Sequence, residues 1–156
     1  MKFLWFGKKK SKVSTEIAAP APIWVVKNFC IVPAPLGENS ETSLDPVVIR
    51  SQLAALVTQG SDSEDQARQA LAEYLHSAGT APVSLGNYSF NSAQGHSARS
   101  LSNGATLLLG RPEVIARATT PFHSEINQAI AAGADQVFAI DGIAYAAFSI
   151  NQELVG

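Results

Sequence analysis

Residues 136–150 read QVFAIDGIAYAAFSI, two apolar segments on either side of Asp141-Gly142. Asp-Gly between two such segments is the strongest short-range signal for a tight β-hairpin, because both turn positions adopt positive φ. We therefore predict strands over 136–140 and 143–150, paired antiparallel. Both are far shorter than the roughly 20 apolar residues that a membrane-spanning helix needs.

Outward from this hairpin, other segments carry strand or helix signals. Strands are predicted over 23–32, 83–91 and 105–110, which are apolar and bounded by turn residues. Helices are predicted over 46–60 after Asp45, from a Ser61/Glu64 capping box to Gly79, over 112–117, and from a Thr120-Pro121 cap to Gly133. Their predicted core-facing residues are Val48, Leu53, Leu56, Val57, Ala67, Ala70, Leu71, Tyr74, Leu75, Ile126, Ala129 and Ile130. The predicted fold class is α+β, a largely antiparallel twisted sheet flanked by helices.

Length and composition set the domain organisation. The 156 residues allow one compact domain and a tail. Hydrophobic residues make up 46% of the chain and charged residues 15%, which is typical of a globular protein that buries a core. Residues 13–22 are rich in Ala, Pro, Ser and Thr without periodicity. We predict a basic, aromatic arm and flexible linker over 1–22 and one domain over 23–156.

Charge is distributed unevenly along the chain. Five of the 11 lysines and arginines lie within the first 12 residues, so the remainder carries a net charge of about −7. An acidic domain repels phosphate backbones, which argues against nucleic acid as a partner. The arm, Met1 to Lys12, combines four large apolar residues with a lysine cluster. This pattern is suited to peripheral contact with an anionic membrane and is equally compatible with a frayed terminus.

Few residues suggest catalysis. Cys30 is the lone cysteine, which excludes an intramolecular disulfide and a Cys/His zinc cluster, and its apolar surroundings predict a buried, inert thiol. His76, His96 and His123 lie far apart and are assigned solvent-facing or capping roles. Ser92 lacks the Gly-x-Ser-x-Gly context of a nucleophile, and no phosphate-binding Gly-rich loop occurs. The residues by themselves predict a soluble α+β domain without an active site or a metal site.

Three short segments point further. They are DQARQALAEYL over 65–75, YSFNSAQGHSA over 88–98 and LGRPE over 109–113. Their order and separation resemble the nucleotide-binding (N) domain of P-type cation-transporting ATPases, with its Ala-Leu-x-Glu-Tyr helix, Pro-Phe-Ser-Ser-x-x-Lys-x-Ser strand and Gly-Ala-Pro-Glu turn. A hairpin through 102–104 and the closing strands after Gly133 also fit. The resemblance covers roughly residues 23–155 and implies an N-domain-like fold.

The resemblance also implies an adenine-nucleotide site. Phe90 stands where the family has the Phe that stacks on adenine, and Gly110 stands where a Gly lets the backbone approach the nucleotide. Neutral hydrogen bonds to the base or ribose are implied for Asn91, Ser92, Gln66 and Gln69. Two basic positions of the family are Gly95 and Gln136 here. Arg111, Arg99 or His96 would therefore have to contact the phosphates, so the binding of ATP or ADP is expected to be weak.

Two function classes are open at this point. The first is a stand-alone or detached N-domain-like module that binds adenine nucleotide without catalysis, with no metal and no tightly bound cofactor. The phosphorylation loop, magnesium-binding segment and membrane helices of a P-type ATPase are not found in the sequence, so no enzyme activity is expected. The second is a regulatory or scaffold protein that docks on a protein partner such as a membrane ATPase. The lone cysteine and the lack of a signal-peptide pattern favour a cytoplasmic location.

Overall fold

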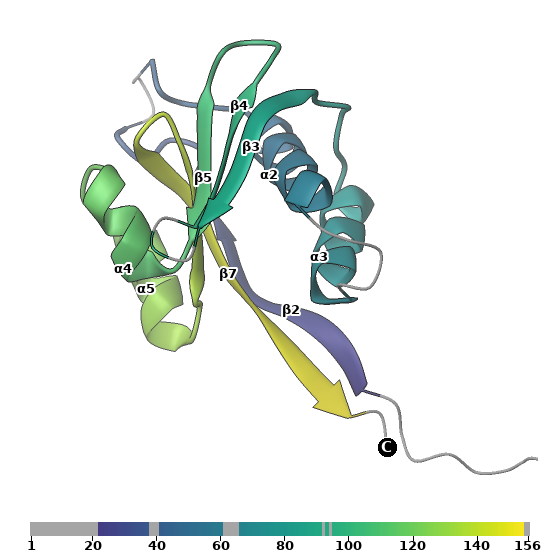
Figure 1. Cartoon of the computed structure of the whole chain (residues 1–156). Coiled ribbons are helices and arrows are strands. Elements are labelled where there is room, and N and C mark those ends of the chain that lie inside the picture. Colours follow the sequence, from purple (N-terminus) through teal and green to yellow (C-terminus); the bar gives the residue numbers. More distant parts are fainter. Residues whose placement is uncertain (1–21, 38–40, 61–65, 92, 94, 155–156) are drawn as a thin grey trace, which may run out of the picture.

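A computed structural model describes residues 22–37, 41–60, 66–91, 93 and 95–154. One six-stranded sheet forms the centre of the fold, in the order β2-β7-β6-β5-β4-β3, and every neighbouring pair is antiparallel (Figure 1). The strands are β2 (Pro22–Ile31), β3 (Leu85–Asn91), β4 (Gly95–Ser100), β5 (Thr106–Gly110), β6 (Gln136–Ile140) and β7 (Ile143–Leu154). The helices are α2 (Pro46–Gly60), α3 (Gln66–Ser77), α4 (Pro112–Ile115), the 3-10 turn η1 (Ala116–Ala118) and α5 (Ser124–Ala132). The predicted α+β class is confirmed.

The β6–β7 hairpin forms as predicted. Asp141 and Gly142 have φ of 51° and 82°, and Ile140 pairs with Ile143 across the turn. Val137, Phe138 and Ala139 are fully buried, because helices cover both faces of β6. β7 continues beyond the predicted end at 150 to Leu154, which pairs with Pro22 of β2. The β2–β7 ribbon extends away from the helices (Figure 1).

Two helical layers cover the sheet, α2 and α3 on one face and α4 and α5 on the other (Figure 1). The first core lies beneath α2 and α3 and is formed with residues such as Leu53, Leu71 and Phe148. The second core lies beneath α4 and α5 and includes Ile115 and Ile126. No helix in the described ranges is long and apolar enough to cross a membrane.

The predicted helices form where the sequence indicates them, but some of the residues predicted to face the core are exposed. Asp45 Oδ1 accepts the Val47 N–H at 2.7 Å and caps α2, as predicted. The core face of α2 includes Ile49, whereas Val48 is 37% exposed. Tyr74 of α3 is 41% exposed and packs on Phe29, with ring centroids 5.1 Å apart. The Ser61/Glu64 box lies outside the described residues.

Two local expectations, the cap of α5 and the burial of Cys30, are corrected by the structure. The α5 cap is His123, whose Nδ1 accepts the Glu125 N–H at 3.1 Å, rather than Thr120-Pro121, because α5 begins at Ser124. Cys30 is only partly buried; burial first, and then the charge of Glu125, raises the pKa of its thiol, which agrees with an inert role. Residues 1–21 of the arm and linker predicted over 1–22 lie outside the described residues, and Pro22 already belongs to β2.

Candidate functional site

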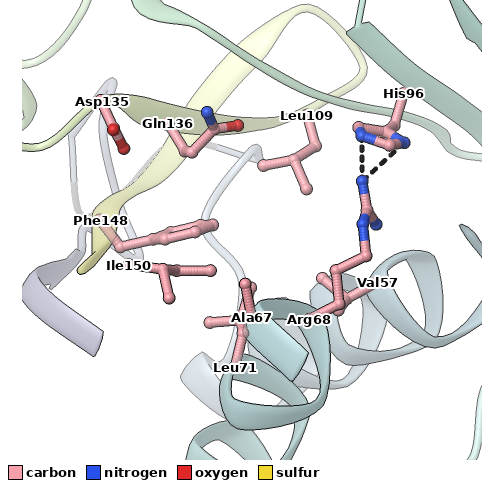
Figure 2. A pocket seen from close by; sticks show the side chains of 10 residues that line it. All are labelled: Val57, Ala67, Arg68, Leu71, His96, Leu109, Asp135, Gln136, Phe148 and Ile150. Atoms are coloured by element: carbon pink, nitrogen blue, oxygen red, sulfur yellow. Dashed lines mark hydrogen bonds between the residues drawn. The ribbon is translucent and has the colours of Figure 1, made fainter. Parts of the chain in front are cut away.

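A cavity of about 250 Å³ opens between α3 and the sheet (Figure 2). The volume lies just below the roughly 300–1,000 Å³ of typical small-molecule sites, so it holds part of a ligand the size of a nucleotide. Its walls come from α2, α3, β4, β5, β7 and the start of β6. The lining residues are Val57, Ala67, Arg68, Leu71, His96, Leu109, Asp135, Gln136, Phe148 and Ile150. Most of these side chains are apolar, which favours a flat, poorly hydrated group.

The polar groups of the cavity lie at its two ends. Arg68, in the first turn of α3, points toward His96 of β4 at one end (Figure 2). Asp135 and Gln136, at the start of β6, lie at the other end. Among the described lining residues, Arg68 is the one permanent cation and Asp135 the one carboxylate. The cavity therefore has a cationic end and an acceptor-rich end.

Three of the described residues contact His96. Arg68 Nη2 contacts His96 Nε2 and lies 3.1 Å from Nδ1, and Tyr88 Oη lies 2.7 Å from Nδ1. The Phe90 ring packs on the imidazole with centroids 4.5 Å apart and planes inclined by 39°. A guanidinium only donates hydrogen bonds, so a ring nitrogen of His96 is the acceptor in this contact. The contact joins the first turn of α3 to the start of β4.

Phe90, predicted to stack on adenine, lies beside the cavity and does not line it. It pairs in register with His96 on the edge strand β3, and 58% of its surface is exposed. One face of its ring is turned to His96. Its stacking role therefore stays a prediction, and His96 separates it from the cavity wall.

Gly95 and Gly110 lie side by side where β4 pairs with β5. A Cβ on Gly95, which has φ +80°, would collide with the Leu109 carbonyl oxygen and lie 3.1 Å from Gly110 Cα. A lysine, as the resembled family has at this position, does not fit here. Asn91 pairs with Gly95, and its Oδ1 accepts the Ala93 N–H at 2.8 Å. Phe90, Asn91 and Gly110 are thus brought to the His96 side of the cavity.

The other predicted residues are spread more widely. Arg111 is exposed, and its Nε donates to Glu113 Oε2 at 3.1 Å beside a neighbouring depression that shares Asp135 and Gln136 with the cavity. Arg99 Nη1 donates to the Gly104 carbonyl at 2.8 Å, at the far end of β4.

The remaining predicted positions are Gln66, Ser92 and Gln69. Gln66 begins α3 one residue before the cavity lining, but its side chain is not described. Ser92 lies outside the described residues, and Gln69 is exposed. Their predicted hydrogen bonds to the base or ribose stay predictions.

Sequence reasoning missed Arg68 and Asp135. A signal for Arg68 existed: it precedes Leu71 by three positions and Leu75 by seven, which places a cation on the buried face of a helix. Asp135 carried no comparable signal, since an acidic residue after Gly133 is typical of a solvated turn. No cluster of metal-binding side chains occurs within the described parts of the chain.

Sequence comparison and structural comparison differ in outcome. No protein-family profile and no curated protein sequence matches the chain. The structure is similar to the N-domain of HMA6, a copper-transporting P-type ATPase, with TM-score 0.52 and 18% identity over 83% of this chain and 98% of that one.

Two larger proteins contain a similar domain. The catalytic domain of the CPx-ATPase CopB-B matches with TM-score 0.53 and 13% identity over 85% of this chain and 39% of that one. A zinc-transporting PIB-type ATPase matches with TM-score 0.54 and 16% identity. The match covers 86% of this chain and 20% of the transporter. The chain thus spans about two fifths of the CopB-B domain and a fifth of the zinc transporter. The described part of the chain has the fold of a P-type ATPase N-domain.

Proposed function

We propose that this domain binds adenine nucleotides weakly and does not catalyse a reaction on its own. The observation that carries the proposal is the cavity between α3 and the sheet, with an apolar wall, acceptors at one end and a cation at the other. The fold supports it, because the similar CopB-B domain is described as changing conformation upon nucleotide binding.

The polarity of the cavity favours one orientation of the ligand. The base packs against Leu71, Leu109 and Phe148, which are at most 4% exposed and already form the inner wall. The exocyclic amine of adenine donates to Asp135 or Gln136, whereas the carbonyl that guanine has at this position would face a carboxylate. The ribose and phosphates then leave past Arg68 and His96.

Weak binding follows from how Arg68 is engaged. Its guanidinium already contacts His96, so a phosphate must compete for it. The cavity also accommodates only part of a nucleotide. At neutral pH most of the affinity is therefore expected to come from the adenosine moiety, with little discrimination between ATP, ADP and AMP.

An NMR titration of the backbone amides tests this proposal. ATP, ADP, AMP and GTP are added up to millimolar concentration at neutral pH, with and without magnesium. We expect similar perturbations for the three adenine nucleotides at His96, Leu109 and Gln136, extending to Phe90 and Gly110, and smaller ones for GTP. No response to any nucleotide would refute the proposal and direct the search to protein partners.

The cytoplasmic location, the docking on a protein partner and the contact of the basic arm with a membrane stay predictions. Deleting residues 1–12 tests the last of these. Co-sedimentation with anionic liposomes that persists after the deletion would exclude the arm as the membrane anchor.

A further inference from the structure

A second cavity, of about 280 Å³, opens at the other end of the sheet face that α2 and α3 cover. β5 and β6 run from one end to the other: Leu109 and Gln136 line the cavity beside α3, whereas Ala105 and Ile140 line the second cavity. Among the described residues, none lines both. The second cavity is therefore a separate site, and an inference drawn from it does not depend on the proposed nucleotide binding.

Gln52 of α2 brings a buried hydrogen-bond acceptor to the second cavity. The residue is 3% exposed, and its Oε1 has no hydrogen-bond partner among the described residues. Because its backbone lies inside a continuous helix, Gln52 lines the cavity with its side chain. An acceptor that is removed from water without a donor costs free energy. A ligand that donates a hydrogen bond to Oε1 removes this cost.

Both charged residues among the described lining of the second cavity are acidic. Glu41 and Asp141 are exposed and lie at its open side. Asp141 Oδ1 accepts the Thr106 N–H at 2.9 Å, which holds the carboxylate in place. Arg99 approaches this end of the sheet, but its Nη1 donates to the Gly104 carbonyl at 2.8 Å and it does not line the cavity. The second cavity is therefore suited to a cation that also donates hydrogen bonds.

We propose that the second cavity binds the ammonium group of a small aliphatic amine. A primary ammonium has three N–H donors, enough for Gln52 Oε1 and the two carboxylates. Leu44, Ala105 and Ile143 supply apolar walls against which a short carbon chain packs. A calcium or magnesium ion would instead need about six oxygen ligands and would leave these walls unused. A free amine and the lysine side chain of a partner protein carry the same chemical group.

An NMR titration of the backbone amides with n-butylammonium chloride tests this proposal at neutral pH and constant chloride concentration. We expect perturbations at Gln52, Ala105 and Ile143 and none at His96 or Leu109, which line the other cavity. n-Butanol has the same carbon chain without the charge, and tetramethylammonium has the charge without N–H donors. Both should bind about tenfold more weakly, the effect of losing one hydrogen bond to a charged group.

Two variants test the two parts of the site. Gln52→Leu removes the acceptor and keeps a good helix former, so amine binding should weaken about tenfold while the urea midpoint of unfolding stays constant or rises. Asp141→Asn removes the charge, keeps Oδ1 as acceptor for the Thr106 N–H, and tolerates the φ of 51°. It should weaken binding by about two- to fivefold, as is typical of an exposed ion pair.

Glu125→Gln is the matched control, because it removes the same charge from α5 on the other face of the sheet (Figure 1). It should bind n-butylammonium like the unmodified chain. If Gln52→Leu fails to fold, Asp141→Asn carries the test, since Asn-Gly is also a favourable hairpin turn.

The outcomes decide between an amine site and its alternatives. No response to n-butylammonium, equal binding of n-butanol, or binding that survives in both variants would overturn the proposal. Stronger perturbation of the same amides by calcium or magnesium chloride would overturn it in favour of a metal site. A lysine capped at both termini distinguishes the two sources. Binding like that of n-butylammonium supports a lysine side chain of a partner, and binding of n-butylammonium alone supports a free amine.

Discussion

Phe90 presents an aromatic ring with a large exposed surface at the edge of the sheet, and two placements of adenine predict different roles for it. With the base in the cavity, Phe90 acts by packing on His96. Phe90→Ala should then weaken ATP binding by about tenfold or less, since an aromatic pair contributes about 0.5–1.5 kcal/mol. Titration of ATP into the variant gives this ratio.

A much larger loss, above about a hundredfold, would instead place the adenine on Phe90 itself, as the resemblance implies. Leu101→Ala is the matched control, because Leu101 is 64% exposed and lies at the other end of β4. It should bind ATP like the unmodified chain. The free energy of unfolding should fall by no more than about 1.5 kcal/mol in Phe90→Ala, the contribution of the aromatic pair with His96.

Two constraints favour glycine at position 95, a positive φ and the lack of room for a Cβ. Gly95→Ala combines a positive φ with a collision against the Leu109 carbonyl, whereas Gly104→Ala has φ +73° and no atom within 4 Å of its Cβ. The Gly104 variant should lose about 1 kcal/mol of unfolding free energy, the cost of the left-handed conformation. The Gly95 variant should lose at least about twice as much. Urea unfolding compares them, and equal losses would show that β4 and β5 can move apart.

At the scale of the elements, the N-terminus of α5 is capped by the side chain of His123. His123→Ala removes the acceptor for the Glu125 N–H and should lower the free energy of unfolding by about 0.5–2 kcal/mol. His123→Asn should restore most of it, because Asn is a favourable N-cap residue. Thr120→Ala serves as the comparison, measured by the same denaturant unfolding. A larger loss from Thr120→Ala than from His123→Ala would contradict the assignment of the cap.

Elements with a local chemical signal could be predicted from the sequence. The β6–β7 hairpin rests on Asp141-Gly142, and α2 rests on Asp45-Pro46, so both were located within a few residues. β4 was different, because GHSARS has no apolar alternation and no β-branched residue. It is a strand because β3 and β5 pair with both of its edges. Such a strand is specified by its neighbours, and only the family resemblance indicated a hairpin there.

At the scale of the whole molecule, Tyr145 couples stability to alkaline pH. It is 2% exposed, its Oη donates to the Thr42 carbonyl, and burial first, then the charge of Asp141, raises the pKa of the phenol. The unfolded chain therefore ionises before the folded one. Stability from this group is fully present below about pH 10 and decreases as pH rises above it.

Urea unfolding between pH 8 and 11 measures this decrease. Tyr145→Phe should flatten the alkaline slope, although it should also cost about 1 kcal/mol at pH 8 through the lost hydrogen bond. Tyr74→Phe, at a 41% exposed position, is the control and should retain the slope. An unchanged slope in Tyr145→Phe would assign the alkaline loss to other groups.

The candidate site could be predicted only in part, and the reason lies in the tertiary fold. The family resemblance predicts Phe90 and Gly110, and the structure brings both to the His96 side of the cavity, although neither lines it. Their contact with a ligand stays a prediction. The cavity itself joins Val57 to Ile150, nearly a hundred residues apart. The spacing of Arg68 to Leu71 and Leu75 indicates a cation on the buried face of α3, but no local pattern indicates that the first turn of α3 meets the start of β4, so the place of Arg68 in the cavity could not be predicted.

The β2–β7 ribbon has a mechanical consequence. Pro22 and Leu154 are partners at its open end, and the two strands run antiparallel. A force that pulls these two residues apart loads the ladder hydrogen bonds one after another, as in a zipper, and not all together as in shear. The domain should therefore yield at low force, beginning at the ribbon, while the part of the sheet between the helical layers is still intact.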